Sequence, residues 1–239
     1  MNNAFLREAM LLGPEAVEHL SRCHVMVFGI GGVGSYCAEA LVRAGVGALT
    51  FIDHDTVGET NLNRQLVALH STLGRPKAEV MAERALDIHP GCRVRALVAR
   101  YDADTRDRFF DGSPCDFVVD AIDLVSCKLD LILTAQAQGI PCVSCCGTGN
   151  KLDPARLRIA DLSETSGCPL ARVLRKELRA RGVAHHPVLF SDEPPATPLP
   201  LETPPPGRRS IPASVSWVPS AAGLMLAGYV VRRLAGLPV

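Results

Sequence analysis

A run of glycines between two apolar segments constrains the fold of this chain more than any other feature. The run is Gly29-Ile-Gly-Gly-Val-Gly34, so its glycines are Gly29, Gly31, Gly32 and Gly34. Residues 25–28 before it read as a buried strand, and residues 35–43 after it have helical apolar spacing. Glycines allow close backbone approach, and a helix N-terminus offers free N–H groups and a positive dipole end. The run predicts a turn that binds phosphate, with a purely structural turn as the alternative.

The residues that follow narrow the choice of nucleotide. A second strand at 48–52 ends in Asp53, where a dinucleotide-binding unit keeps an acid for ribose hydroxyls. Further polar residues come close behind it: Asp55, Asn61, Arg64, Gln65 and Lys77. Arginine and lysine neutralise triphosphate charge and carboxylates hold Mg²⁺, whereas hydride transfer has no need of such a set. The pattern predicts an enzyme that cleaves ATP and disfavours a nicotinamide oxidoreductase.

In order along the chain, these residues form a recognisable signature. It reads Gly-x-Gly-Gly-x-Gly, Asp-x-Asp, Asn-x-x-Arg-Gln and Gly-x-x-Lys, with a later aspartate at Asp123. The chain thereby resembles the ThiF/MoeB/ubiquitin-activating superfamily, whose members adenylate carboxylates, from about Arg7 to the last helix. A narrower resemblance is to the bacterial tRNA threonylcarbamoyladenosine dehydratases (TcdA). It rests on Arg7 with residues 11–13 and on segments 147–154, 168–178 and 216–223.

The resemblance implies a role for each matching residue. Asp53 would hold the ribose, while Arg64 and Lys77 would grip the phosphates. Asp123 would bind Mg²⁺, and Arg7 would reach the ATP of the partner subunit of a symmetric homodimer. The implied catalytic residues are Arg7, Arg64, Lys77 and Asp123. The implied ATP-binding residues are Gly29, Gly31, Gly32, Gly34, Asp53, Asp55, Asn61, Arg64, Gln65, Lys77 and Asp123.

Each of these side chains also has an ordinary structural interpretation. Asp53 and Asp123 could serve as helix caps or turn acids. Lys77 could be solvated beside Pro76, and Arg64 could form a salt bridge within its loop. Asp120 lies near Asp123, and for Asp120 a buried role in the turn is weighed against a role in metal binding.

Strands alternating with helices predict an α/β fold: a Rossmann-like, doubly wound, mainly parallel sheet. The expected organisation is a single ThiF-like adenylating domain over 1–239, completed by C-terminal strands and helices. Its parts are an N-terminal helix at 1–20, a nucleotide-binding core at 24–146 and a C-terminal region at 147–239, with a proline-rich loop at 192–207. Short strands are expected at 157–160, 188–190 and 215–218.

Composition limits the partners and the cellular compartment. Equal numbers of basic and acidic residues, 25 of each, argue against general nucleic-acid affinity. A local exception is 172–181, a helix whose basic face is either solvated or in contact with a tRNA backbone. Residues 1–13 do not read as a signal peptide, and the apolar segment 221–237 favours a buried helix over a membrane span.

The cysteines are the second compositional signal. Their odd number, nine, and irregular spacing fit a reducing cytoplasm. Cys142 and Cys145 form one C-x-x-C without a second pair for zinc, so we interpret them as core residues. Cys168 is the best candidate for an exposed thiol, with nothing beside it in sequence to lower its pKa.

The preferred hypothesis is an ATP-dependent tRNA threonylcarbamoyladenosine dehydratase. The threonyl carboxylate would be adenylated, and the carbamoyl group would then close a ring, so that pyrophosphate and AMP leave. The alternative is adenylation of the C-terminal glycine of a ubiquitin-like sulfur-carrier protein, as ThiF and MoeB perform it. A nucleotide-sensing or tRNA-binding protein without catalysis is a third hypothesis. A sulfur-handling protein partner is left open.

Overall fold

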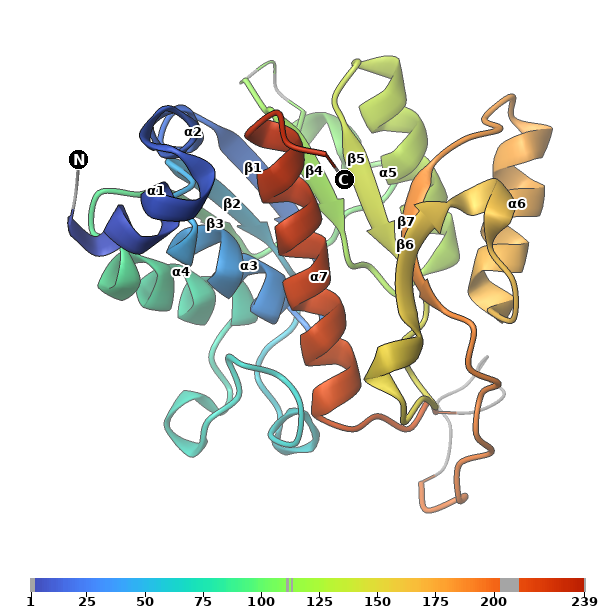
Figure 1. Ribbon diagram of the computed structural model, residues 1–239. Helices are drawn as coiled ribbons and strands as arrows, with labels where there is room; N and C mark the ends of the chain where they lie inside the picture. The colour runs from blue at the N-terminus through green and yellow to red at the C-terminus, as the bar shows by residue number, and fades with distance from the viewer. Residues whose placement is uncertain (1–2, 111, 113, 203–210, 239) are drawn as a thin grey trace.

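The computed structural model describes residues 3–110, 112, 114–202 and 211–238. Its centre is a seven-stranded sheet in the order β3-β2-β1-β4-β5-β7-β6 (Figure 1). The strands are β1 His24–Phe28, β2 Ala48–Ile52, β3 Arg93–Leu97, β4 Phe117–Asp120, β5 Cys142–Cys145, β6 Leu157–Asp161 and β7 Pro187–Ser191. All neighbours are parallel except β6 and β7, which pair antiparallel. The predicted mainly parallel α/β sheet is confirmed.

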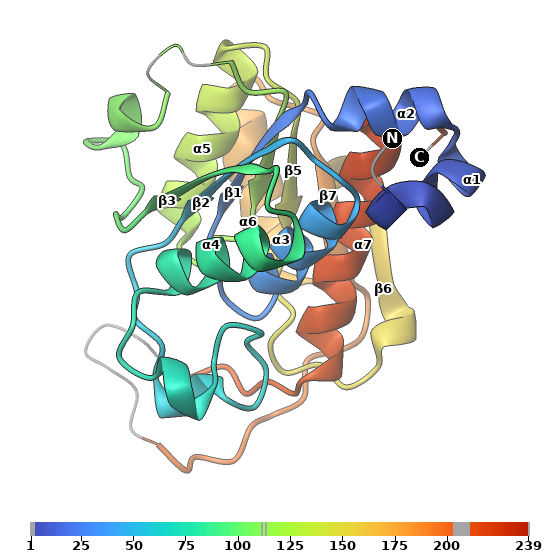
Figure 2. The ribbon, with the colours of Figure 1, turned by 90° about the vertical axis from the view of Figure 1, so that its left-hand side faces the viewer.

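Helices cover both faces of this sheet, as Figure 2 shows from the side. They are α1 Leu6–Leu12, α2 Pro14–Leu20, α3 Gly34–Arg43, α4 Lys77–Ile88, α5 Val125–Ala137, α6 Pro169–Ala180 and α7 Trp217–Leu234. Helices α3, α4 and α7 lie on one face, and α5 and α6 lie on the other (Figures 1 and 2). The winding therefore changes direction between β1 and β4, which are hydrogen-bonded neighbours. In such folds ligands bind beyond the carboxyl ends of the strands at this reversal point.

The N-terminal segment departs from the single helix expected at 1–20. Gly13 separates α1 from α2 and has a φ of +90°, a conformation that a residue with a side chain rarely adopts. Pro14 then begins α2, where its missing N–H has no consequence. Residues 1–2 lie outside the described part of the chain. Because the apolar side chains Phe5, Ala9 and Val17 form one small cluster, the two short helices pack as a hairpin.

The strand expected at 215–218 is wrong, because helix α7 begins at Trp217. A close contact of α7 with α3 fixes the helix here: a Cβ on Gly223 would lie 2.3 Å from the carbonyl oxygen of Val33. Such backbone-to-backbone packing is a tertiary effect that the apolar pattern of 215–218 does not encode. The strands expected at 157–160 and 188–190 are confirmed as β6 and β7.

The proline-rich loop was expected to lack regular structure, and residues 192–202 contain neither helix nor strand. Its remaining residues, 203–207, lie outside the described part of the chain.

Helix α7 is buried along one side through Val218, Ala222, Leu226 and Val230, each fully covered. This confirms the buried C-terminal helix. Among the described residues, no helix has the length and apolar character needed to cross a membrane.

Candidate nucleotide-binding site

The glycine run forms the turn between β1 and α3, and its glycines have different tasks. A Cβ on Gly34 would lie 1.7 Å from the carbonyl oxygen of Gly29. Gly29 itself has a φ of +90°, and a Cβ there would lie 2.6 Å from the carbonyl oxygen of Ala121. Gly34 is therefore required by the closeness of the turn to its own backbone, and Gly29 by the packing of the turn against the segment after β4. Gly31 is different, because its Cβ position has no neighbour closer than 3.9 Å, which leaves room for a ligand.

Backbone N–H groups are available at this turn. In the described part of the chain, the N–H groups of Gly31, Gly32 and Val33 donate to no protein acceptor. Helix α3 starts at Gly34 without a side-chain cap, so its positive dipole end also faces the turn. Unpaired donors at a helix N-terminus bind anions, and phosphate is the anion they suit.

Asp53, at the end of β2, holds this turn in place. Its Oδ2 accepts a hydrogen bond of 2.6 Å from the N–H of Ile30, and its Oδ1 accepts one of 2.8 Å from the N–H of Asp55. The carboxylate is nearly covered, and each oxygen retains a second lone pair for a ligand hydroxyl. The acid predicted from its position after β2 therefore lies against the phosphate turn.

Lys77 and Asp55 bring two of the sequence motifs together. The Lys77 Nζ donates to Asp55 Oδ2 at 3.0 Å, and the backbone N–H of Lys77 donates to the Asp55 carbonyl at 3.0 Å. Lys77 is 6% exposed while Asp55 is 54% exposed, so the lysine is held and its partner faces solvent. His54 joins this group with its Nε2 at 3.4 Å from Asp55 Oδ1, a neighbour that the sequence analysis did not use.

Arg64 and Gln65 lie over the glycine turn. The Arg64 Cγ is 3.5 Å from the Cβ position of Gly32, and Gln65 Nε2 is 3.9 Å from that of Gly31. Gln65 is buried, and among the described residues its Oε1 has no hydrogen-bond partner. An orphaned buried acceptor beside a phosphate turn fits a ligand that brings donors, such as nucleoside hydroxyl or amino groups.

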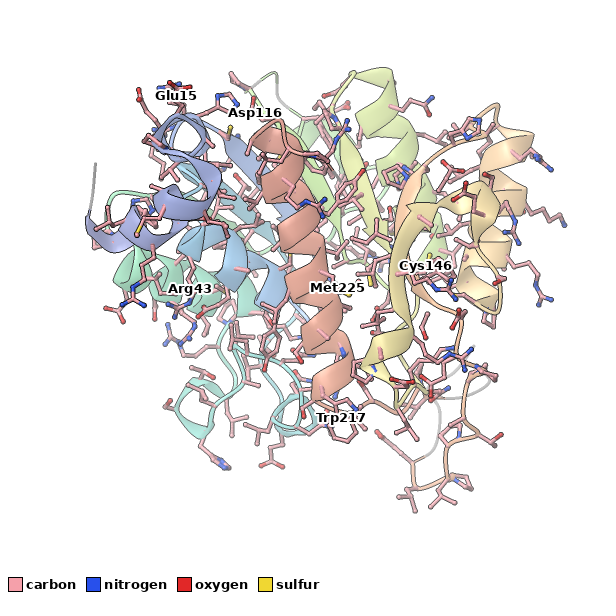
Figure 3. The ribbon with its side chains drawn as sticks, in the orientation of Figure 1. Glu15, Arg43, Asp116, Cys146, Trp217 and Met225 are labelled. Carbon is pink, nitrogen blue, oxygen red and sulfur yellow. The ribbon has the colours of Figure 1, made fainter. Side chains whose placement is uncertain are left out.

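Two neighbours shape the loop that carries Arg64. Asn61 Oδ1 accepts from the N–H of Gly58 at 3.1 Å, so this predicted site residue closes a turn. Asn63, which sequence reasoning missed, accepts from Arg64 Nη1 at 2.9 Å and donates to the Ser214 carbonyl at 3.0 Å. The missed signal was its position inside the Asn-x-x-Arg-Gln motif. Asn63 connects Arg64 to the segment that leads into α7, whose first residue is Trp217 (Figure 3).

The two aspartates at and just beyond the end of β4 have different environments. Asp120 is the last residue of β4 and, with Lys128 of α5, forms a fully buried ion pair of 2.7 Å. Asp123 lies three residues later, is exposed and forms no ion pair with the described residues. Ala121, two residues before Asp123, packs closely against Gly29 of the phosphate turn. The structural role weighed for Asp120 is therefore the one observed, and Asp123 has a free carboxylate at the edge of the site.

Arg7 is not brought to this site within one chain. It is exposed on α1. Helix α1 follows Phe5, whose ring lies 3.3 Å from the Cβ position of Gly45, at the end of α3 remote from the glycine turn. The role expected for Arg7 requires a second copy of the chain and stays a prediction.

The expectations for Cys168 are both wrong. The residue is buried, because it packs with Leu162, Leu174 and Cys146 in a cluster beneath α6. A hydrogen bond from the Cys146 thiol and the backbone N–H groups at the start of α6 lower the pKa of Cys168 to about 6. Both effects come from residues distant in sequence or from helix geometry. Cys145 is buried as expected of a core residue, and Cys142 is partly buried.

Helix α6 does not present all of its basic residues to solvent. Arg175 donates to the Thr165 carbonyl at 2.6 Å and to Thr165 Oγ1 at 2.9 Å, so it holds the preceding loop. Arg181 is paired with Glu177 at 2.7 Å. The remaining basic residues of 172–181 are exposed and form no ion pair with the described residues: Arg172, Lys176 and Arg179.

The glycine turn lies at the reversal point of a doubly wound sheet, with Arg64 over it and Lys77 bonded to Asp55 just after β2. This arrangement defines a nucleotide-binding α/β protein. The sequence pattern of the ThiF family matches residues 5–238, so the chain belongs to the ThiF family.

The individual relatives indicate which branch of the ThiF family this chain resembles. The chain is 41% identical to the tRNA threonylcarbamoyladenosine dehydratase of Bacillus subtilis, over 98% of this chain and 95% of that protein. It is also similar to the crystal structure of E. coli TcdA in complex with ATP, with a TM-score of 0.87 and 34% identity over 98% of this chain and 94% of that one. The molybdopterin-synthase adenylyltransferase of Salmonella typhimurium is 34% identical, over only 54% of this chain and 51% of that protein.

Proposed function

We propose that this chain is an ATP-dependent tRNA threonylcarbamoyladenosine dehydratase that works through an acyl-adenylate. One observation carries the proposal: the match to the Bacillus subtilis dehydratase covers 98% of this chain and 95% of that protein. The site geometry agrees with it, since free N–H groups and Arg64 lie at the glycine turn, and Lys77 is bonded to Asp55, two residues after Asp53.

The proposed reaction has two steps. The threonyl carboxylate of the modified adenosine attacks the α-phosphorus of ATP, and pyrophosphate leaves. The carbamoyl group of the same nucleoside then attacks the activated carbonyl, which closes the ring and releases AMP. Intramolecular attack has a high effective concentration, so this second step needs no enzyme nucleophile. None of the site residues is assigned the role of a nucleophile, which agrees with that chemistry.

The chain's own contribution is charge stabilisation and positioning. The N–H groups of the glycine turn and the cations of Arg64 and Lys77 would stabilise charge on the phosphates in the first step. Asp53 would orient the ribose through its free lone pairs. For Mg²⁺, Asp123 offers a hard oxygen donor without a competing cation. Bound there, the ion would supply further stabilisation of phosphate charge.

We propose that the exposed cations of α6 contact the tRNA backbone. Arg172, Lys176 and Arg179 follow each other at spacings of four and three residues, so they lie along one side of the helix. Each phosphate contact adds to affinity and to its salt dependence. Charge reversal of all three should weaken tRNA binding by about tenfold or more and reduce its salt dependence, with ATP binding unchanged. Arg22→Glu, at an exposed cation between α2 and β1 and outside α6, is the control. Unchanged tRNA affinity would remove α6 from the proposal.

A homodimer with Arg7 acting across the interface is part of the proposal. Next to Arg7, α1 exposes Met10 and Leu11, at 81% and 86%, which is unusual for apolar side chains without a partner. Arg7→Ala and Lys77→Ala variants would each be inactive alone. Mixed and re-equilibrated, half of the dimers would carry one intact site, so about a quarter of the wild-type activity should return. No recovery, in a sample shown to be dimeric by light scattering, would place Arg7 outside the partner's site.

The assay for the function itself is ATP–pyrophosphate exchange with bulk bacterial tRNA. Exchange that depends on tRNA carrying threonylcarbamoyladenosine, with the nucleoside losing the mass of one water, is the expected result. Exchange only with a carrier protein ending in Gly-Gly would move the chain to the sulfur-carrier branch, and no exchange with either would favour a non-catalytic binder. A tRNA substrate would place the protein in the cytoplasm, and co-purification would test for a sulfur-handling partner.

A further inference from the structure

The single tryptophan of the chain is the first residue of the helix that packs on the glycine turn. Pro219, two residues further along α7, has its Cβ 3.2 Å from the Cβ position of Gly32. Because a helix rises about 1.5 Å per residue, Trp217 lies only about 3 Å further along the helix axis. Figure 3 shows Trp217 at the end of α7 that lies beside the loop following β2. Trp217 therefore borders the proposed phosphate site.

The indole ring is exposed and yet held in one orientation. Trp217 is 50% exposed, and among the residues that the structure describes its ring forms no contact with another aromatic ring. Its Nε1–H donates to the Leu152 carbonyl at 2.7 Å, and the N–H of Leu152 donates in turn to the Glu193 carboxylate at 3.0 Å. With its polar edge already bonded, the ring offers a ligand its flat face and not its N–H.

Hydrogen bonds connect the segment before α7 to the site. The Asn150 N–H donates to the Ala213 carbonyl, and Asn150 Oδ1 accepts from the Ala213 N–H, each at 2.7 Å. The carbonyl of the next residue, Ser214, accepts from Asn63 Nδ2 at 3.0 Å, and Asn63 is also bonded to Arg64. The indole and the Arg64 cation are thus held in one framework. A ligand that contacts both would bind without ordering either of them first.

We propose that Trp217 is the surface on which the nucleobase of the acyl substrate stacks. This inference rests on the proposed function, in which the carboxylate of a modified adenosine must reach the α-phosphorus of ATP at the glycine turn. The threonylcarbamoyl linker between that carboxylate and the purine ring is short, about 6 Å when extended. The base therefore lies beside the turn, where Trp217 is exposed. Aromatic side chains are the usual stacking partners of unpaired bases in RNA-binding sites.

The hydrogen bonds around the ring favour a base over an extended peptide. A peptide tail gains affinity from main-chain hydrogen bonds to its partner. Here the Trp217 N–H, the Leu152 carbonyl and the Leu152 N–H are already bonded to one another or to Glu193. This surface offers a flat apolar face and engaged polar groups, which suit the π-face of a base. A sulfur-carrier tail ending in Gly-Gly has no ring to place there.

The fluorescence of Trp217 reports directly on its own surroundings, because the sequence has one tryptophan. The full chain is titrated with tRNA carrying threonylcarbamoyladenosine in the presence of a non-hydrolysable ATP analogue. Stacking of the base should quench the emission, and the same tRNA without the modification should quench it less, since no carboxylate brings its base to the site. Unchanged emission at saturating modified tRNA would overturn the proposal. Emission that changes on dilution of the protein alone would also overturn it, by placing the ring between two copies.

Substitutions separate stacking from a structural role. Trp217→Leu removes the aromatic face and should raise the KM for tRNA by about tenfold or more, with the KM for ATP unchanged. Trp217→Phe also loses the hydrogen bond to Leu152 but retains a face, so its KM for tRNA should stay within about threefold of the wild type. Leu224→Ala is the matched control, because Leu224 lies two turns along the same side of α7 and is 52% exposed.

The kinetic outcomes distinguish failure of this inference from failure of the proposed function. Equal increases in KM for the leucine and phenylalanine variants would assign Trp217 to its hydrogen bond, and no increase in either would remove it from the site. In both cases exchange by the wild type would still depend on modified tRNA, so the dehydratase proposal would stand. If the wild type shows no such exchange, the dehydratase proposal fails, and the fluorescence titration, which needs no turnover, still decides whether a base stacks on Trp217.

Discussion

Asp120 and Asp123 offer the sharpest test of the site, because one stabilises the fold and the other is proposed to act in the reaction. The Asp120–Lys128 pair is fully buried with 2.7 Å between Lys128 Nζ and Asp120 Oδ2. The carboxylate also accepts from the N–H of Ile122 at 3.1 Å through Oδ1. Asp120→Ala removes both bonds and leaves the Lys128 ammonium buried without its counter-charge.

The magnitude follows from that burial. Removing one partner of a buried pair costs about 3–5 kcal/mol, because an uncompensated charge remains in a medium of low polarity. For a chain of this length, about 3 °C of Tm corresponds to each kcal/mol, so Tm should fall by roughly 10 °C. Asp123→Ala removes an exposed carboxylate without an ion pair to the described residues and should shift Tm by no more than about 2 °C.

The assay combines thermal unfolding with ATP–pyrophosphate exchange measured below the Tm of both variants. The exchange activity of Asp123→Ala should fall by about 10²-fold or more while its Tm remains close to that of the wild type. The double variant Asp120→Asn with Lys128→Met should recover much of the lost stability, since it removes the buried charge and retains an acceptor for Ile122. Equal Tm values for Asp120→Ala and Asp123→Ala would refute the reasoning.

Three further predictions concern other parts of the molecule. Lys77→Ala should lower kcat/KM for exchange by about 10²–10³-fold, whereas Arg75→Ala, on a cation paired with Glu83, should not. Burial lowers the pKa of His186 to about 4. Because the unfolded chain takes up this proton at a higher pH than the folded chain, the free energy of unfolding should be highest above about pH 6.5 and fall by up to ~3 kcal/mol towards pH 4. The fall should be smaller in His186→Gln. Asn63→Ala should raise the KM for ATP several-fold with little change in Tm, since Arg64 loses an acceptor; an unchanged KM would contradict its positioning role.

The sequence by itself determined the phosphate turn and the sheet that supports it. Local geometry explains why: Gly29 and Gly34 are required by contacts within the turn and with the segment that follows β4. The apolar strands and the acid after β2 are equally local signals. The order of the family's motifs along the chain indicated that the nucleotide is ATP. The family resemblance, and not strand position, implied that Arg64, Gln65 and Lys77 belong to one site; in the structure Arg64 and Gln65 lie over the glycine turn and Lys77 is bonded to Asp55.

Only the tertiary structure decided which of several similar residues serve the fold and which remain available for function. Asp120 and Asp123 are alike in sequence, and burial beside Lys128 of α5 distinguishes them. Cys168 acquires its low pKa from a thiol that lies on another element, and Arg175 is taken up by the loop before α6. Burial and ion pairing depend on neighbours brought together by folding. A side chain's charge state and availability therefore follow from packing, whereas its place along a strand or turn follows from the sequence.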